Sequence, residues 1–181
     1  SLYKFNHLFD EELGTIEVYD SSEFGVAQKR KRMIAGSFPR KLFESYRERT
    51  PVRHLRDVIE GLSDEEIFDP IYGHKISNLT DHIEESPLNS EEERINRDSK
   101  SYHPVYNKMS FPDQLDRPAR TVTALCTRVS RESIVIQGDK GFRRLTVRER
   151  GCIQSFPADY QFYGNSYGGK LKMIGNAVPP L

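Results

Sequence analysis

The sequence has few cysteines, no net charge and no long hydrophobic run. Its two cysteines, Cys126 and Cys152, fit reduced thiols in a cytoplasmic protein better than a disulfide framework. No apolar segment approaches the length of a membrane span, and no basic-then-apolar signal segment stands at the start. The chain does not begin with Met, which suggests a piece of a longer protein. We therefore expect no membrane partner.

The common catalytic signatures are also missing. There is no G-x-S-x-G elbow, no P-loop and no H-E-x-x-H motif in the 181 residues. The five histidines show no ligand spacing, so a metal site is not expected. From these absences alone, the chain is a polar domain without a clear activity.

The charges are sorted along the chain although their sum is zero. Residues 29–56 are strongly basic, residues 57–98 are acidic, and residues 117–150 are basic again. Two basic blocks around an acidic insert predict a phosphate-facing surface. Simple solvated faces explain the charges equally well at this point.

Local patterns predict the elements of the first half. The apolar run from Arg32 to Gly36 is typical of a buried strand. Thr50 as N-cap, followed by Pro51, predicts a helix that ends near Gly61. Residues 63–88 show no periodicity and are expected to form an irregular insert. A capping box of Ser90 and Glu93 predicts a short helix after it.

The second half has β-rich and helical segments in turn. Residues 121–125 and 133–137 are predicted to form strands that could be neighbours. Thr146 and Glu149 have capping-box spacing, which predicts a helix that buries Cys152. Residues 175–180 read as a turn that would normally lead into another helix.

Three segments together resemble the C-terminal part of a DNA cytosine-5 methyltransferase. They are residues 24–34 (FGVAQKRKRMI), residues 117–124 (RPARTVTA), and residues 144–157 closing on GNAVPP at 175–180. The resemblance implies a mixed α/β fold: the edge of a Rossmann-like methyltransferase domain plus a small α+β target recognition domain. The expected parts are residues 1–48 in the catalytic domain, 49–143 in the recognition domain with its acidic insert, and 144–181 in a hinge helix and return segment.

The same resemblance implies a base pocket and a cofactor pocket. Members of the family flip a cytosine out of duplex DNA and methylate it from S-adenosylmethionine. Arg32, and with it Arg30, would face the flipped base or its phosphates, because alternation along a strand points both the same way. Asn176, Ala177 and Val178 would form the cofactor-side wall, next to a Gly175 with an unusual backbone angle. The plain alternatives are a basic strand edge and a helix C-cap.

The expected partner is double-stranded DNA. Arg117, Arg120 and Thr121 would organise the recognition region and meet the DNA backbone, because phosphate contacts position while base contacts specify. Base readers are expected between Arg94 and Gln114. The DNA-binding candidates are Gln28, Arg97, Lys100, Arg117, Arg120 and Thr121.

The departures from the family pattern limit the prediction. The family nucleophile follows a proline, whereas Cys126 follows Leu125 and Cys152 follows Gly151. The chain by itself is therefore expected to be inactive and to need an N-terminal half, in the cytoplasm of a bacterium or with a phage. Three classes remain open: a fragment of a single-chain enzyme, the recognition subunit of a split methyltransferase, and a non-catalytic DNA-binding module.

Overall fold

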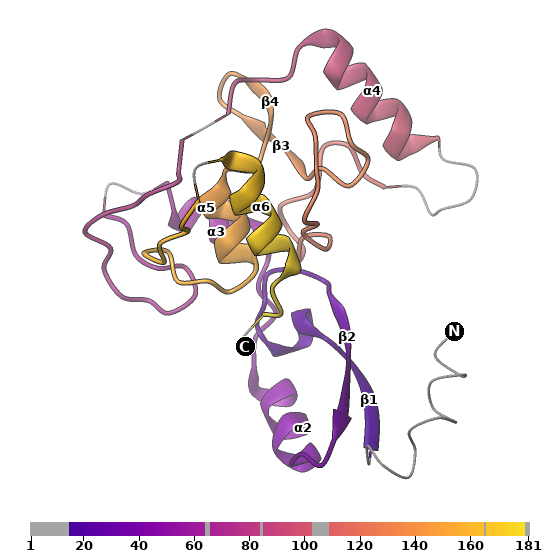
Figure 1. Ribbon diagram of the computed structural model, residues 1–181, viewed down its shortest axis with the longest axis vertical. Coiled ribbons are helices and arrows are strands. Elements are labelled where there is room, and N and C mark those ends of the chain that lie inside the picture. Colours follow the sequence, from indigo (N-terminus) through magenta and orange to yellow (C-terminus); the bar gives the residue numbers. More distant parts are fainter. Residues whose placement is uncertain (1–14, 64–65, 84, 103–108, 165, 180–181) are drawn as a thin grey trace.

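The computed structural model describes residues 15–63, 66–83, 85–102, 109–164 and 166–179. Within these ranges it has five α-helices, one short 3-10 helix and two antiparallel two-stranded sheets (Figure 1). A β-hairpin and α2 form one end of the molecule, and the remaining elements lie beyond them. The segment after α6 descends toward the hairpin, where Val178 and Pro179 lie beside Tyr19 and Arg32.

The hairpin consists of β1 (Thr15–Asp20) and β2 (Lys31–Gly36), joined through the 3-10 helix η1 (Ser21–Phe24). The strands pair in antiparallel register from Thr15 opposite Gly36 to Asp20 opposite Lys31. In β2 exposed and half-buried residues alternate, as expected for a strand with one covered face. The strand predicted at residues 32–36 is confirmed, but its expected burial is wrong, because no residue of β2 is buried.

Helix α2 (Arg40–Arg49) was not expected from the sequence. The next helix was predicted to begin at Pro51 after Thr50, but it begins at Leu55. Thr50 is the C-cap of α2 rather than an N-cap, and its hydroxyl donates to the carbonyl of Tyr46 at 2.7 Å. Pro51 disfavours helical backbone in the residue before it, which explains the end of α2 there. Helix α3 (Leu55–Gly61) begins only after His54, whose backbone N–H donates to Asp57 at 2.8 Å.

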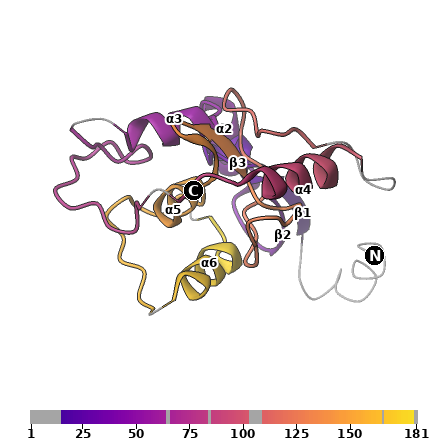
Figure 2. The same cartoon turned by 90° about the horizontal axis from the view of Figure 1, so that it is seen from above.

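Helix α4 (Ser90–Ser101) has the predicted capping box, shifted by one residue. Asn89 is the N-cap: its side chain accepts from the N–H of Glu92 at 2.9 Å, and Glu92 accepts from the N–H of Asn89 at 3.0 Å. Asn caps as well as Ser, and neighbouring glutamates allow either register. In both views α4 lies apart from α3, α5 and α6 (Figure 1, Figure 2).

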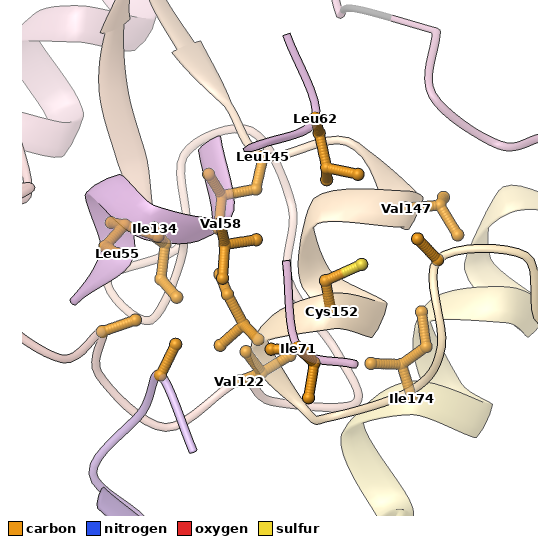
Figure 3. Packing of buried hydrophobic residues seen from close by; sticks show 14 of the residues in the cluster. Leu55, Val58, Leu62, Ile71, Val122, Ile134, Leu145, Val147, Cys152 and Ile174 are labelled. Atoms are coloured by element: carbon orange, nitrogen blue, oxygen red, sulfur yellow. The ribbon is translucent and has the colours of Figure 1, made fainter. Parts of the chain in front are cut away.

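The hydrophobic core lies among α3, α5 (Val147–Ile153), α6 (Tyr167–Asn176) and the hairpin of β3 (Val135–Gly138) and β4 (Gly141–Arg144). Figure 3 shows its side chains converging from these elements, with the Cys152 thiol among them. The capping box of Thr146 and Glu149 is present as predicted and starts α5. Cys152 is buried, also as predicted.

The predicted strand at residues 121–125 is not formed, so the pairing suggested for residues 133–137 is wrong as well. The partner of β3 is β4, with Val135 opposite Arg144. Around Val122 the backbone is satisfied by side chains: its N–H donates to Gln28 at 2.9 Å, and its carbonyl accepts from Arg30 at 2.9 Å. Long-range hydrogen bonds thus replace the ladder that the β-rich composition predicted.

Gly175 also differs from the prediction. It lies inside α6 and is not among the residues with positive φ. Its lack of a side chain serves close packing, because a Cβ there would overlap the backbone of Thr123 and Ala124. The described chain is a small mixed α/β structure; its place at the edge of a Rossmann-like domain and its domain boundaries remain predictions.

Candidate functional site

Gln28 joins three parts of the chain inside the protein. Its side chain is fully buried, and its amide nitrogen donates to Gln154 at 2.5 Å and to the carbonyl of Ile153 at 3.3 Å. Its amide oxygen accepts from the N–H of Val122 at 2.9 Å. Gln28 therefore links the hairpin to α5 and to the 117–123 segment. A direct contact of this side chain with DNA would require these bonds to open.

Arg30 makes a second connection through the same region. One guanidinium nitrogen donates to the carbonyl of Val122 at 2.9 Å, and the other donates to Gly175 at 2.8 Å and Ala177 at 3.1 Å. The residue is only 4% exposed. Burial, and then the neighbouring Arg32 cation, lower the pKa of Arg30 below its ordinary value. Arg30 thus holds the 117–123 segment against the end of α6.

Arg32 faces a different environment. It is half-buried on β2, and its guanidinium donates to its neighbouring carbonyl at Lys31. It lines a hollow of about 200 Å³ together with Val178 and Pro179 from the closing segment. The other walls are three aromatic residues, one serine and one isoleucine of the hairpin and α2: Tyr19, Phe24, Phe43, Ser21 and Ile34. The structure therefore brings Arg32 and Val178, predicted for base and cofactor, to one small pocket.

The predicted alternation along this segment is present. Lys29 and Lys31 are exposed, whereas Arg30 is buried and Arg32 is half-buried. Because β2 begins at Lys31, Arg30 precedes the strand and lies within the body of the protein. The Arg30 guanidinium is bonded to carbonyls inside the protein, whereas Arg32 lines the hollow beside Val178.

The closing segment follows α6 directly. Asn176 is the last helical residue and is exposed, while Ala177 is the C-cap and is half-buried. Val178 is 66% exposed, which leaves its side chain available for a ligand or another polypeptide. The segment is held to the end of α5, because the side chain of Gln154 donates to the carbonyl of Ile174 at 2.7 Å. The hydrogen bonds to the carbonyls of Ile174 and Ala177 therefore fix the backbone that carries Asn176, Ala177 and Val178.

The recognition candidates divide into anchored and exposed groups. Arg120 forms a bidentate ion pair with the buried Asp113 at 2.7 and 2.9 Å and also donates to the carbonyl of Ser133. The hydroxyl of Thr121 donates to the carbonyl of Lys29 at 2.7 Å. Arg117 is exposed and donates to the hydroxyl of Ser110 at 2.7 Å. Arg120 and Thr121 are therefore held by internal hydrogen bonds, while Arg117 is exposed; their role in a recognition region stays a prediction.

The two candidates on α4 differ in the same way. Arg97 is exposed, pairs with Glu93 at 2.7 Å and lies 4.9 Å over the ring of Phe111. Lys100 is fully buried, and its ammonium donates to Asn96 at 3.0 Å. Burial lowers the pKa of Lys100 to about 8, against an opposing effect of Asp113. The predicted base readers His103 and Asn107 lie outside the described residues.

The two cysteines lie in different surroundings. Burial raises the pKa of the Cys152 thiol to about 12, so the reactive thiolate is disfavoured. Cys126 is half-buried, and its carbonyl accepts from Arg144 at 3.2 Å. Among the described residues, no group of three or more His, Cys, Asp or Glu is placed to hold a metal ion. No helix in the described part of the chain is long and apolar enough to cross a membrane.

Two contributors to the site escaped the sequence prediction. Gln154 was quoted only as part of a motif, yet it contacts both Gln28 and the carbonyl of Ile174. The aromatic residues Tyr19, Phe24 and Phe43 form the wall of the Arg32 pocket, and their rings pack with centroids 5.5 to 5.8 Å apart. Periodicity gave no signal for Phe43, because α2 itself was not predicted.

Comparison with known proteins gives matches to one family and to several of its members. The family model "C-5 cytosine-specific DNA methylase" matches residues 7–181. The chain is 27% identical over 179 residues to the type II methyltransferase M.PspPI of Psychrobacter sp. (strain TA137), covering 90% of this chain and 42% of that protein. It is 30% identical over 187 residues to the type II methyltransferase M.FnuDI of Fusobacterium nucleatum, covering 91% and 51%.

A third relative matches only in part. The type II methyltransferase M.AquIB of Picosynechococcus sp. is 49% identical over 49 residues, which is 22% of this chain but 35% of that protein. M.AquIB is therefore itself a short protein. The chain spans about half the length of the first two relatives. Since the family model covers nearly the whole sequence, this chain belongs to the C-5 cytosine-specific DNA methylase family.

Proposed function

We propose that this chain is the C-terminal portion of an enzyme that transfers a methyl group from S-adenosylmethionine to C5 of cytosine in a specific duplex DNA sequence. The carrying observation is that Arg32 and Val178 line one pocket while Arg30 joins the segments beside it. A base pocket and a cofactor pocket must meet where the methyl group passes between them. This chain would supply one wall of each.

In this proposal Arg32 is the base-side residue. Its guanidinium is always charged and has donors in a fixed fork, which suits a base carbonyl oxygen or the phosphates of a flipped nucleotide. Arg30 acts as a positioning residue, because its donors already hold the carbonyls of Val122, Gly175 and Ala177. Loss of Arg30 would therefore disturb both walls at once.

The closing segment fits a cofactor as one wall only. Asn176 and Val178 are exposed, and Ala177 is fixed between them, but the adjoining hollow of about 200 Å³ is too small for the whole of S-adenosylmethionine. When bound, the cofactor supplies the methyl group. Asn176 would donate to it, and Val178 would exclude water from its side.

DNA recognition falls to the second part of the chain. Arg97, Arg117 and their exposed neighbours are proposed to meet the duplex, whereas Arg120 and Thr121 hold the region in shape. Gln28 and Lys100 are fully buried and would act on DNA through the segments that they join.

The nucleophile would come from a separate N-terminal half. Cys152 is buried with a raised pKa, and neither cysteine follows a proline. That half is either the preceding part of the same polypeptide or a second subunit. The short relative M.AquIB, of which a 49-residue match covers 35%, keeps the split enzyme in view as the second candidate.

The test is methyl transfer to duplex DNA. The chain is produced together with the coding sequence just upstream, or with the neighbouring frame that carries a Pro-Cys motif, and labelled S-adenosylmethionine is added. We expect 5-methylcytosine only when both parts are present. Methylation by the 181-residue chain alone would show that the nucleophile assignment is wrong. No methylation by the assembled pair would refute the proposed activity and leave a DNA-binding module.

A further inference from the structure

A second hollow, of about 460 Å³, lies between η1, α2 and the segments at residues 50–53 and 71–72. The described residues that line it include neither Arg32 nor a residue of the closing segment, so it is distinct from the pocket of about 200 Å³. Aromatic and aliphatic side chains form most of its lining: Phe24, Phe43, Tyr46, Tyr72, Leu42 and Ile71. Its size and apolar lining are typical of sites that bind small molecules.

Arg53 is the charged residue among the described residues of this lining. One of its guanidinium nitrogens, Nη2, donates to the carbonyl of Ile71 at 2.8 Å, whereas Nη1 is buried without a hydrogen-bond partner in the described part of the chain. Such a donor has lost its hydration without a bond in return, so an acceptor beside it is stabilising. Arg53 as a whole is half-buried, so a small rotation of its guanidinium presents Nη1 to an acceptor in the hollow.

The charge of Arg53 is not taken up by the nearest carboxylate. Burial raises the pKa of Tyr72, Asp69 raises it further and Arg53 lowers it, so both charges lie near this ring. The two oxygens of Asp69 are already occupied, because they accept from the backbone N–H groups of Ile71, Tyr72 and Ala158. Arg53 is therefore available to an anion from outside.

We propose that this hollow binds a small aromatic carboxylic acid, whose ring packs among the aromatic side chains and whose carboxylate pairs with Arg53. Aromatic walls favour an aromatic group through offset and edge-to-face contacts, and the guanidinium fork suits a carboxylate. An inorganic anion would leave the apolar walls in water, and a neutral apolar molecule would leave Nη1 without a partner. Leu42 and Tyr46 are 52% and 62% exposed, so a ligand can enter from solvent and cover them.

The hollow shares a wall with the Arg32 pocket. Phe24 and Phe43 line both, and their rings meet edge-on with centroids 5.8 Å apart. A ligand packed against these rings on one side fixes their positions, and with them one wall of the Arg32 pocket. The site therefore acts on the reaction through this wall and not through contact with the base. This regulatory step rests on the proposed function, whereas binding of the acid does not.

The experiment compares two probes, naphthalene-2-carboxylate and the uncharged naphthalene-2-methanol, by calorimetric titration of the 181-residue chain. The acid is expected to bind about tenfold more tightly than the alcohol. Arg53→Met keeps an apolar stem without the guanidinium, and should reduce this preference to about twofold or less while the alcohol binds as before. The retained affinity for the alcohol shows that the hollow is intact, which misfolding cannot imitate.

Arg49→Met is the matched control. Arg49 lines a neighbouring hollow of about 440 Å³ on α2 but not this one, so the preference for the acid should stay. Equal binding of the two probes, failure of both to bind, or loss of the preference in Arg49→Met instead of Arg53→Met would each overturn the site. The same titration is made with the assembled protein, and no binding of the acid there also overturns it.

Methyl transfer by the assembled parts tests the regulatory step separately. Saturating naphthalene-2-carboxylate is expected to change the rate with duplex DNA by at least about twofold, and to leave the rate of the Arg53→Met enzyme unchanged. An unchanged rate in the parent enzyme refutes the coupling through Phe24 and Phe43, whatever the titration shows. Absence of methylation without any probe refutes the proposed function instead, and the titration then decides the binding site alone.

Discussion

Helices α5 and α2 meet the rest of the molecule in opposite ways. All seven residues of α5 are buried, including Arg148, Glu149 and Arg150, whereas none of the ten residues of α2 is buried. Charged residues enter the interior around α5 because they have partners there: Arg148, for example, donates to the carbonyls of Thr80 and Tyr160. Leu42 and Tyr46 on α2 remain more than half exposed.

The difference indicates that contacts around α5 contribute more to the free energy of unfolding than contacts around α2. A helix whose charged groups are buried depends on each partner, since a partner lost leaves an unpaired charge inside. A helix on the surface loses little when one side chain changes. Substitutions around α5 and around α2 should therefore differ in cost by several kcal/mol.

The largest expected effect comes from Glu149→Ala. The Glu149 side chain is 1% exposed, pairs with Arg143 at 2.8 Å and accepts from the N–H of Thr146 at 2.7 Å. Its removal leaves a buried cation without its carboxylate and the N–H of Thr146 without its side-chain partner, and should cost about 3 to 5 kcal/mol in urea unfolding. The control is Glu60→Ala, which removes an exposed pair with Arg56 and should cost about 0.5 kcal/mol or less. Equal losses in the two variants would contradict the contrast.

Gly175→Ala should have the next largest effect. A methyl group there would overlap the backbone of Thr123 and Ala124, and backbone cannot move aside as a side chain can. We expect a loss of about 2 kcal/mol in the free energy of unfolding. Gly168→Ala in the same helix is the matched control, because a Cβ there meets no atom within 4 Å. A stable Gly175→Ala variant would show that α6 does not pack against this segment.

Lys100 should make stability depend on pH. Its folded pKa is lowered to about 8 by burial, so between about pH 8 and 10.5 the unfolded chain binds more protons than the folded one. This contribution to the free energy of unfolding therefore rises with pH in that window, by about 1 to 2 kcal/mol up to pH 9.5. Lys100→Met should lack the rise, whereas Lys41→Met on exposed α2 should keep it.

Cys152 changes the free energy of unfolding in the opposite direction over part of the same pH range. Burial raises the pKa of Cys152 to about 12, so its thiol keeps its proton in the folded state while the unfolded thiol loses it above about pH 9. Stability from this group falls as pH rises through that range. Both parent and variant contain Cys152, so the difference between their profiles isolates Lys100. Parallel profiles would refute the assignment.

The parts that the sequence predicted depend on neighbours along the chain. The strand at residues 32–36 and the capping box of Thr146 and Glu149 are local signals, and both are present. The strand predicted at residues 121–125 is wrong because the backbone partners of Val122, Gln28 and Arg30, lie more than 90 residues away in the sequence. Gly175 was assigned a special backbone angle, whereas its role is a close approach between distant segments. No local pattern carries such contacts.

The same limit applies to the candidate site. The family resemblance indicated Arg30, Arg32 and Val178 as site residues. It did not distinguish a residue that donates hydrogen bonds inside the protein from a residue that lines a pocket. That distinction depends on burial: Arg30 is 4% exposed and holds three carbonyls, while Arg32 reaches the hollow beside Val178.

The smallest expected effect comes from Leu42→Gln on α2. Leu42 is 52% exposed, so its replacement removes little buried area and should change the free energy of unfolding by about 0.5 kcal/mol or less. Leu55→Ala in α3 is the counterpart: Leu55 is fully buried, and the cavity left should cost about 2 to 5 kcal/mol. Thermal and urea unfolding of both variants measure the gap. If Leu42→Gln were as damaging as Leu55→Ala, α2 would belong to the cooperative core, and the contrast between α2 and α5 would reflect helix composition rather than packing.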